Sequence, residues 1–362
     1  MLTDSVRHRA LEAIHHLVDD IPPWNDVLEA MCKVIGGESA TFILLGADDD
    51  LLAMHQWNVD PRAHAEYAAH HFQHDIVAPR TLDAPVGTWF DTTALFTTEE
   101  LSRSAYYADF LCRYDMRQML TWIAEQGPTR RGAMSIQRSH PGAHAHRQIH
   151  TETTRLLTDQ IQRSMNQRKA GAATWVATAE SAFDNFNEAL LLLNGSGRVQ
   201  HLSPVADRLL ATPGGLAVRQ GKLSHDAPTV RAALATGIRR AASSAERVRL
   251  IIPLKREGDG QLLDLVRAPP ALGIAGETML LGRLQTRNTR AVDLDRLMAA
   301  FDITPAEARV LAALCAGQTP QQHATSQALS VHTVRKQIAV LMDKMGCARQ
   351  VDLVRKGLAA QS

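Results

Sequence analysis

The sequence predicts an α+β protein in which two mixed α/β segments precede a small helical domain. Three observations predict this: strand-like runs paired across short turns, amphipathic helices between them, and helical signals alone towards the C-terminal end. A chain of 362 residues is long for one core, so two or three domains are expected. We expect domains at 1–148, 178–286 and 293–362, with a linker helix at 149–177.

Residues 1–148 predict two β-hairpins and several helices. TFILLG and LLAMHQW flank an acidic turn, and MLTWIAEQ and RGAMSIQR flank Gly127-Pro128. Helices are expected before the first hairpin and over PRAHAEYAAHHFQHD, where apolar residues recur at helical spacing. Strand pairs with helices on one side resemble the GAF/PAS type of sensor fold.

Aromatic residues are concentrated in this first segment. Thirteen of the seventeen Trp, Phe and Tyr residues precede residue 125, and none lies between Phe186 and Phe301. Large rings enclose small apolar molecules well. The first segment is therefore the better candidate for a ligand pocket, although the same rings could form an ordinary core.

The segment from 149 to 170 has one apolar stripe, which includes Leu157 and Ile161. Such a stripe can close the first domain, and it can also pair with the same helix of a second subunit. The two interpretations are compatible, and we list both residues as candidate dimerisation positions.

Residues 178–286 repeat the mixed pattern in a shorter form. A strand, a tight turn, a strand, short helices and three further strands follow one another, which is the order of elements in PAS domains. The predicted strands and helices of this segment contain no aromatic residue beyond Phe186. A flavin or haem pocket without a ring is improbable, so we interpret the segment as a degenerate PAS-like spacer and dimerisation domain.

The last segment predicts four helices. Pro305 and Glu307 begin the first and Gly317 ends it, Thr319 caps the second, and Ser330 caps the third. The third helix repeats apolar residues along one face from Val334 to Met345. His332, Thr333, Arg335, Lys336 and Ala339 lie on the other side.

This opposite side can enter the major groove of DNA. An Arg side chain can bind guanine in a bidentate manner, and a small residue such as Ala339 allows a close approach to base edges. Hydroxyl groups and N–H groups at helix N-termini favour phosphate. The alternative is a solvated helical hairpin with incidental charge.

The segment from about 296 to 360 resembles the LuxR/FixJ-type helix-turn-helix domain. The resemblance rests on TPAE, Gly317, SVHTVRKQ, KMG and RQVDLV at matching intervals. It implies that Arg335, Lys336 and Ala339 face the bases and that Thr319, Ser330 and Thr333 face phosphate. It also implies that Val351, Val354 and Leu358 belong to the helix through which such domains dimerise. We list His332 and Lys344 as further phosphate-facing candidates.

A sensor-like domain, a PAS-like domain and this module together resemble bacterial one-component transcription regulators. That resemblance implies double-stranded DNA, a small-molecule effector and a second copy of the chain as partners, with contact to RNA polymerase possible. The segment AYYADFLCRYDM is similar to one that recurs in the N-terminal domains of such regulators.

Another resemblance, within the first segment, is to the acyl-homoserine-lactone-binding domain of quorum regulators. It sets Tyr67, Asp75 and Trp89 approximately where that family holds its signal, and we add Trp57 as a fourth ligand-binding candidate. In that family the Asp accepts the amide N–H, and the Trp donates to the carbonyl of the lactone ring. A lactone receptor is therefore one alternative for the sensor function.

Histidine clusters supply another alternative. His140, His144, His146 and His150 lie close in the sequence, as do His70, His71 and His74. Imidazoles at this density can bind zinc, nickel or copper. No Cys or carboxylate completes a tetrahedral set nearby, so our prediction names no metal ligand and no resident cofactor.

Composition narrows the function classes further. The net charge is +1, but residues 317–362 contain six basic residues and two acidic ones, which suits a protein that contacts DNA with one end. Four separated cysteines predict reduced thiols and a cytoplasmic location. No membrane span, nucleophile elbow, P-loop, dinucleotide fingerprint or HExxH is present, so we expect neither a membrane protein nor an enzyme.

Overall fold

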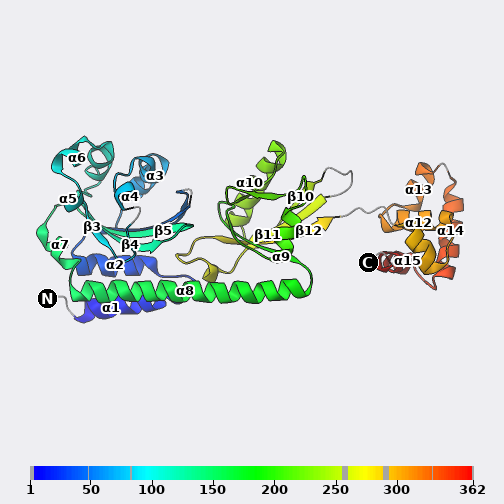
Figure 1. Ribbon diagram of the computed structural model, residues 1–362, viewed down its shortest axis with the longest axis horizontal. Coiled ribbons are helices and arrows are strands. Elements are labelled where there is room, and N and C mark those ends of the chain that lie inside the picture. Colours follow the sequence, from blue (N-terminus) through cyan, green and yellow to red (C-terminus); the bar gives the residue numbers. More distant parts are fainter. Residues whose placement is uncertain are drawn as a thin grey trace. The chain divides into compact units, whose positions relative to one another are not determined.

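The computed structural model describes residues 4–47, 49–81, 84–254, 260–287, 293–327 and 329–360. Two five-stranded sheets and a group of C-terminal helices make up the fold, which confirms the α+β class (Figure 1). Residues 293–360 fall in a different compact unit from most of the two sheets. Within the described ranges, no helix combines the length and apolar character that crossing a bilayer requires.

The first sheet is antiparallel and has the strand order β2-β1-β5-β4-β3. Four of its strands form the two predicted hairpins, β1 with β2 and β4 with β5, and both predictions are confirmed. The strands are β1 (Ser39–Gly46), β2 (Leu51–Trp57), β3 (Trp89–Asp91), β4 (Gln118–Gln126) and β5 (Arg130–Arg138).

One face of the first sheet packs on α2 (Trp24–Ile35), and α1 (Asp4–His15) and the first half of α8 (Glu152–Asn185) pack on α2 in turn. The apolar stripe of α2 is buried against alternate residues of the strands, because strand side chains alternate between faces. Trp24 stacks on Phe42 at 4.0 Å between ring centroids. The large buried side chains of this first core include Trp24, Trp122, Phe42, Met31, Met134 and Ile136.

Short helices lie over the other face of the first sheet. They are α3 (Pro61–Ala69), η2 (His71–His74), α4 (Val77–Thr81), α5 (Thr92–Leu95), α6 (Thr98–Arg103) and η3 (Tyr106–Leu111). A second apolar cluster forms here from Ala63, Val77, Phe96, Leu101, Tyr106, Phe110, Leu111, Met116 and Met119. The AYYADFLCRYDM segment, which contains η3, therefore contributes to this cluster.

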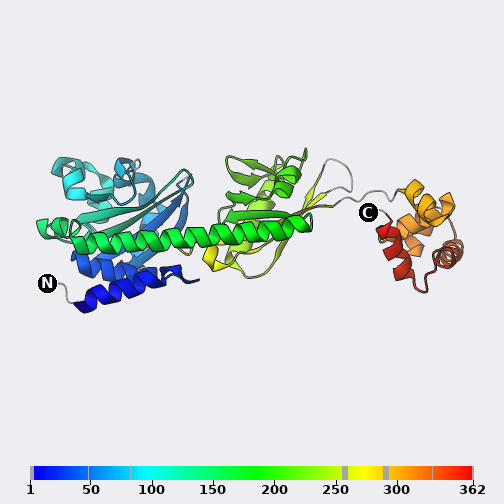
Figure 2. The same ribbon diagram turned by 60° about the horizontal axis from the view of Figure 1, so that its bottom comes forward.

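Helix α8 corrects two expectations. It follows α7 (Ala143–Gln148) and runs without a break to Asn185, beyond the expected linker helix at 149–177 (Figure 2). Leu157 and Ile161 are completely buried in the first core of their own chain. They are therefore not available for pairing with a second subunit, and the predicted dimerisation role of these two residues is wrong for this structure.

The second sheet has the order β10-β11-β12-β6-β7, with β6 paired antiparallel to β12 and β7. Trp175 and Val176 of α8 pack against its Leu192 and Met279. The strands are β6 (Ala189–Asn194), β7 (Val199–Leu202), β10 (Val248–Pro253), β11 (Gly260–Arg267) and β12 (Met279–Arg287). The remaining elements are α9 (Pro204–Leu210), the hairpin β8 (Ala217–Arg219) with β9 (Lys222–Ser224), α10 (Pro228–Ser243) and η4 (Pro270–Leu272).

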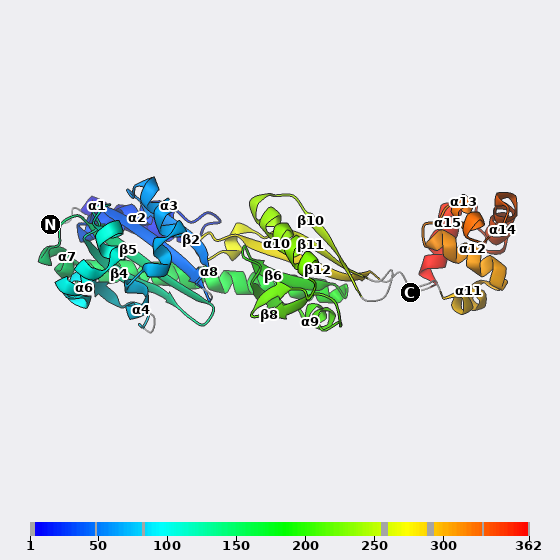
Figure 3. The ribbon, with the colours of Figure 1, turned by 90° about the horizontal axis from the view of Figure 1, so that it is seen from above.

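The C-terminal part contains five helices in the described ranges, one more than predicted (Figure 3). The additional helix, α11 (Leu294–Phe301), is capped by Asp293 and buries Leu297. The four predicted helices are α12 (Pro305–Cys315), α13 (Pro320–Ser326), α14 (Val331–Lys344) and α15 (Gln350–Ala359). Gly317 has φ +79°, and the N–H groups of Gly317 and Gln318 bond back to Leu314 and Ala313, which ends α12 sharply.

Candidate nucleic-acid interface and ligand pocket

The helix pair α13–α14 is held against α12 by one continuous core. Val334, Ile338 and Leu341 of α14 are buried with Val310, Leu311 and Leu314 of α12. The spacing of four and three residues places the α14 side chains on one face, as the sequence predicted. Packing of α14 is thereby fixed from one side, and its other side is left exposed.

That exposed side of α14 carries the five residues singled out from the sequence. His332, Thr333, Arg335, Lys336 and Ala339 are all exposed. The two cations are one residue apart in the first two turns of the helix, close to its N-terminus. A helix N-terminus and adjacent cations are both attractive to phosphate.

Two capping arrangements define the N-termini of α13 and α14. The hydroxyl oxygen of Thr319 accepts the N–H of Gln322 at 3.2 Å, while the side chain of Gln322 accepts the N–H of Thr319 at 2.8 Å. Ser330 Oγ accepts the N–H of Thr333 at 3.0 Å, and the two hydroxyl oxygens lie 2.7 Å apart. These hydroxyl groups are exposed and fix the start of each helix.

Lys344 has a different environment from the other predicted phosphate contacts. Its Nζ lies 2.8 Å from Oε2 of Glu307, whose side chain is only 11% exposed. The same carboxylate oxygen accepts the N–H of Thr304 at 2.8 Å, which completes a capping box on α12. The hydrogen bond from Lys344, followed by that from Thr304, lowers the pKa of Glu307. Lys344 therefore joins α14 to the start of α12.

Helix α15 presents an apolar pair to solvent. Val351 is 75% exposed and Leu358 is 48% exposed. They are seven residues apart, so they share one face of the helix. Val354 is partly buried and packs against the core of the helical part.

A pocket lies in the first sheet domain, on the face opposite α1, α2 and α8. Its volume is about 130 Å³, whereas one buried water needs roughly 10–15 Å³. The sheet supplies one wall through alternate residues, among them Thr41, Ile43, Thr121, Ala133 and Ser135. The other wall comes from the short helices, through Val59, Ala63, Tyr67, Asp75, Val77, Thr81, Tyr106, Phe110, Leu111 and Met116.

Asp75 is the acidic group among the apolar side chains of the helical wall. Its Oδ1 accepts the N–H of Val77 at 2.8 Å, and its Oδ2 accepts the hydroxyl of Tyr67 at 3.1 Å. Tyr106 also hydrogen-bonds to Asp75. Burial, and then the adjacent carboxylate, raise the pKa of both tyrosines, so these hydroxyls stay protonated and act as donors.

The two predicted tryptophans lie elsewhere, which corrects the expected ligand site. Trp89 is paired with Trp122, and Trp57 with Ala40, in the strand register. Residues directly opposite each other in a sheet share a face, and Trp122 and Ala40 belong to the core on the helix side. Trp89 and Trp57 therefore pack against that core, and neither lines the pocket.

Sequence reasoning missed Tyr106 and the polar residues of the strand wall. Tyr106 comes from η3, a segment separated from Tyr67 and Asp75 by more than a helix, and local patterns do not reveal such a contact. Thr121 and Ser135 face each other across β4 and β5 with hydroxyl oxygens 3.0 Å apart. The sequence signal that could have identified Thr121 and Ser135 is a hydroxyl residue that alternates with large apolar residues in a buried strand.

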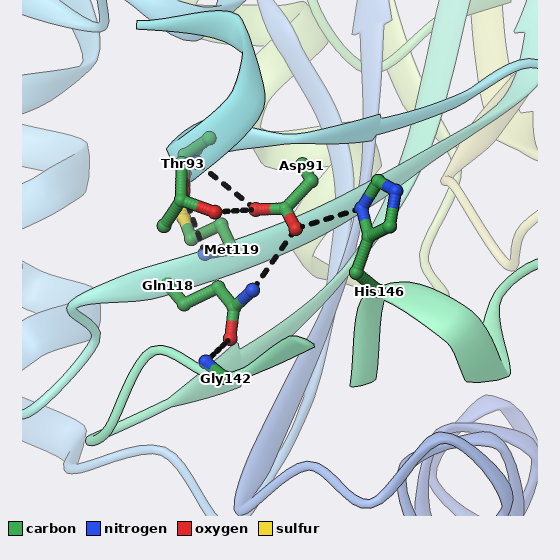
Figure 4. A network of polar contacts seen from close by, with 7 residues as sticks. Asp91, Thr93, Gln118, Met119, Gly142 and His146 are labelled. Atoms are coloured by element: carbon green, nitrogen blue, oxygen red, sulfur yellow. Dashed lines mark hydrogen bonds and ion pairs between the residues drawn. The ribbon is translucent and has the colours of Figure 1, made fainter. Parts of the chain in front are cut away.

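Histidines of both clusters make contacts within the fold. His146 Nδ1 lies 3.0 Å from Oδ2 of the buried Asp91, which also accepts from Gln118 and Thr93 (Figure 4). Gln118 in turn accepts the N–H of Gly142, so the network ties α7 to the strands. His70 is in edge contact with the rings of His71 and His74. Among the described residues, no group of three or more His, Cys, Asp or Glu is placed to hold a metal ion.

Comparison with known proteins gives only distant similarities. No family model and no curated protein sequence matches the chain. Solved structures with a partial likeness include the N-acylhomoserine-lactone-dependent LuxR-family transcription factor CepR2 from Burkholderia cenocepacia (TM-score 0.35, 12% identity, 45% of this chain and 92% of that chain). Another is the ligand-binding domain of VqsR from Pseudomonas aeruginosa (0.34, 10%, 43% and 96%).

A third is VqmA from Vibrio cholerae in a complex with ligand and DNA (0.31, 17%, 50% and 88%). At such TM-scores the likeness carries no argument about what this chain binds, which has to come from its own residues.

Proposed function

We propose that this protein is a ligand-responsive, one-component transcription regulator of the bacterial cytoplasm that binds a two-fold-symmetric DNA site as a homodimer. The observation that carries the proposal is the exposed side of α14. It presents Arg335, Lys336 and Ala339 opposite a buried stripe, directly after the short helix α13. A helix held in this way can be inserted into a major groove without disturbing the core behind it.

Charge and capping support the proposal. The helical segment is basic on a nearly neutral chain, so attraction to phosphate is limited to one end of the molecule. Thr319, Ser330 and Thr333 are exposed at the starts of α13 and α14, where hydroxyl groups can meet the DNA backbone. In this proposal they position the helix, while Arg335 and Lys336 read bases.

The pocket supports the ligand-responsive part. Its lining combines apolar and polar side chains, and Asp75 with Tyr67 and Tyr106 forms the acidic, hydrogen-bonded group of the helical wall. We infer an effector with an apolar body and at least one hydrogen-bond donor for Asp75. The lactone alternative depended partly on Trp89, which faces the other side of the sheet, and the metal alternative has no cluster among the described residues.

In vitro selection of DNA by the full-length protein tests the DNA-binding function. The selected sites should converge on two inverted half-sites about one helical turn, or a multiple of it, apart. Random sequences after repeated rounds would contradict the proposal. Native mass spectrometry of protein purified from its source tests the effector, because a retained small molecule should be lost on substituting Asp75→Asn.

A further inference from the structure

The connection between β11 and β12 completes the core of the first sheet. Ile274 is 3% exposed and Ala275 is fully buried, and both belong to the core built from α1, α2, α8 and the first sheet. The polypeptide on both sides of this connection forms strands of the second sheet. Residues 270–277 are therefore shared between two structures that otherwise have separate cores.

Arg168 of α8 holds this connection in place. Its Nε donates to the carbonyl of Gly273 at 2.7 Å, and its Nη2 donates to Pro270 at 3.0 Å. The same guanidinium donates to Asp20 at 3.2 Å, to Leu17 at 3.4 Å and to Asp19. One side chain, itself only 5% exposed, thus binds the segment after α1 and the connection of the second sheet.

All of these acceptors are backbone carbonyl oxygens, and three of them belong to short helices or their C-caps. Leu17 lies in the short helix η1 (His16–Val18), Pro270 begins η4 and also accepts the N–H of Gly273, and Gly273 is the C-cap of η4. Carbonyls at the C-terminal ends of helices carry partial negative charge and favour a cation. Only the planar fork of an Arg can donate to so many of them at once, since Lys offers a single nitrogen.

Two strands of the first sheet hold the connection from another side. His55 Nε2 of β2 donates to the carbonyl of Ala275 at 2.6 Å. Arg130 of β5 lies 3.6 Å from the carboxylate of Glu277, which is 2% exposed and accepts the N–H of Ala275 at 2.7 Å. The same two strands line the pocket through Met54, Gln56, Ala133 and Ser135 on their opposite face.

We propose that residues 270–277, clamped by Arg168, join the two sheets into one cooperative unit, through which occupancy of the pocket biases the second sheet. The connection contacts the rear face of the strands that line the pocket. A displacement of those strands therefore acts directly on Ala275 and Glu277, which lie in the connection between β11 and β12 of the second sheet. The cooperativity follows from the contacts alone, whereas its regulatory meaning rests on the proposed function.

Pulsed hydrogen–deuterium exchange of the full chain along a thermal ramp tests the clamp. Peptides from β1 and β5 report on the first sheet, and peptides from β6 and β12 report on the second. In the wild type both sets should become exchange-competent at one midpoint temperature. Arg168→Lys should separate the midpoints by several degrees. Arg163→Lys, an exposed Arg on the same helix, is the matched control and should leave one midpoint.

Transmission from the pocket is tested by Ala133→Leu, which fills part of the cavity. It should shift the midpoints of both sheets in the wild-type background and that of the first sheet alone in the Arg168→Lys background. Ile274→Ala replaces Arg168→Lys if the latter does not fold. The proposal would be overturned if the two sheets had separate midpoint temperatures in the wild type. It would also be overturned if the midpoint temperatures of both sheets fell equally in Arg168→Lys. No DNA or effector enters this experiment, so its failure is distinguishable from failure of the proposed function.

Discussion

Arg335 and Lys344 show how two basic residues of one helix come to have different roles. Arg335 is exposed on the side opposite the buried stripe of α14, whereas Lys344 is paired with Glu307 at the far end of the helix. The sequence alone assigned both to DNA, because basic residues in a basic segment look alike until their partners are known. The difference gives separate predictions for DNA affinity and for stability.

Arg335→Ala should weaken binding to the selected DNA site and relax the base preference at one position of each half-site. A bidentate contact to a base is worth about 1–3 kcal/mol. Thr333→Ala should weaken binding to all sequences alike, because a phosphate contact carries no sequence information. Quantitative footprinting on selected and randomised sites measures both effects. Arg309→Ala, at an exposed Arg of α12, is the control, and equal footprints for Arg335→Ala and wild type would refute base readout.

Lys344→Met should destabilise the helical part by roughly 1 kcal/mol, because it leaves the nearly buried carboxylate of Glu307 with fewer hydrogen bonds. Lys336→Met should leave stability unchanged. The folded state lowers the pKa of Glu307 below its ordinary value of 4.5. The pair therefore stabilises above that pH, and its contribution is lost as pH falls through the lowered pKa. Thermal unfolding across a descending pH series checks this: the difference between Lys344→Met and the wild type should shrink as the pH falls below 4.5, and a difference that stays constant over the whole series would contradict it.

At the scale of elements, local patterns predicted the hairpins and the four helices of the C-terminal part. Each is defined by its own turn, cap or apolar period, which a short stretch of sequence contains. The positions of Trp89 and Trp57 depend on pairing with Trp122 and Ala40, which is a matter of register between distant strands. Likewise, the apolar stripe that includes Leu157 and Ile161 correctly predicted that these side chains are buried. An apolar stripe does not indicate whether its own chain or a second subunit covers it.

The two faces of β1 and β5 should respond differently to the same substitution. Ala133→Leu places three additional carbons in the pocket and should be slightly stabilising. Ala40→Leu, on the fully buried helix side, should destabilise by about 1–3 kcal/mol through overpacking. Urea unfolding of both variants tests the assignment of faces. A larger loss for Ala133→Leu than for Ala40→Leu would mean that the cavity is not open.

At the scale of the whole molecule, one α14 helix contacts too few base pairs for useful affinity, so the proposed regulator needs a dimer. Burial of Leu157 and Ile161 in their own chain removes one candidate interface. The exposed pair Val351 and Leu358 on α15 then becomes the stronger candidate within the described residues. An isologous contact through this face would place two α14 helices around a two-fold axis, which matches a symmetric DNA site.

Val351→Asp with Leu358→Asp should therefore lower affinity for the symmetric site by at least tenfold and leave binding to a single half-site almost unchanged. Both positions are exposed, so the charges should not unfold α15, and circular dichroism verifies this. Val218→Asp, at another exposed aliphatic residue, is the control. Analytical ultracentrifugation with and without DNA provides the second measurement, because the double variant should bind the two half-sites without cooperativity. A folded double variant that still occupies both half-sites in one cooperative step would show that α15 is not the interface, and that a different surface brings two copies together.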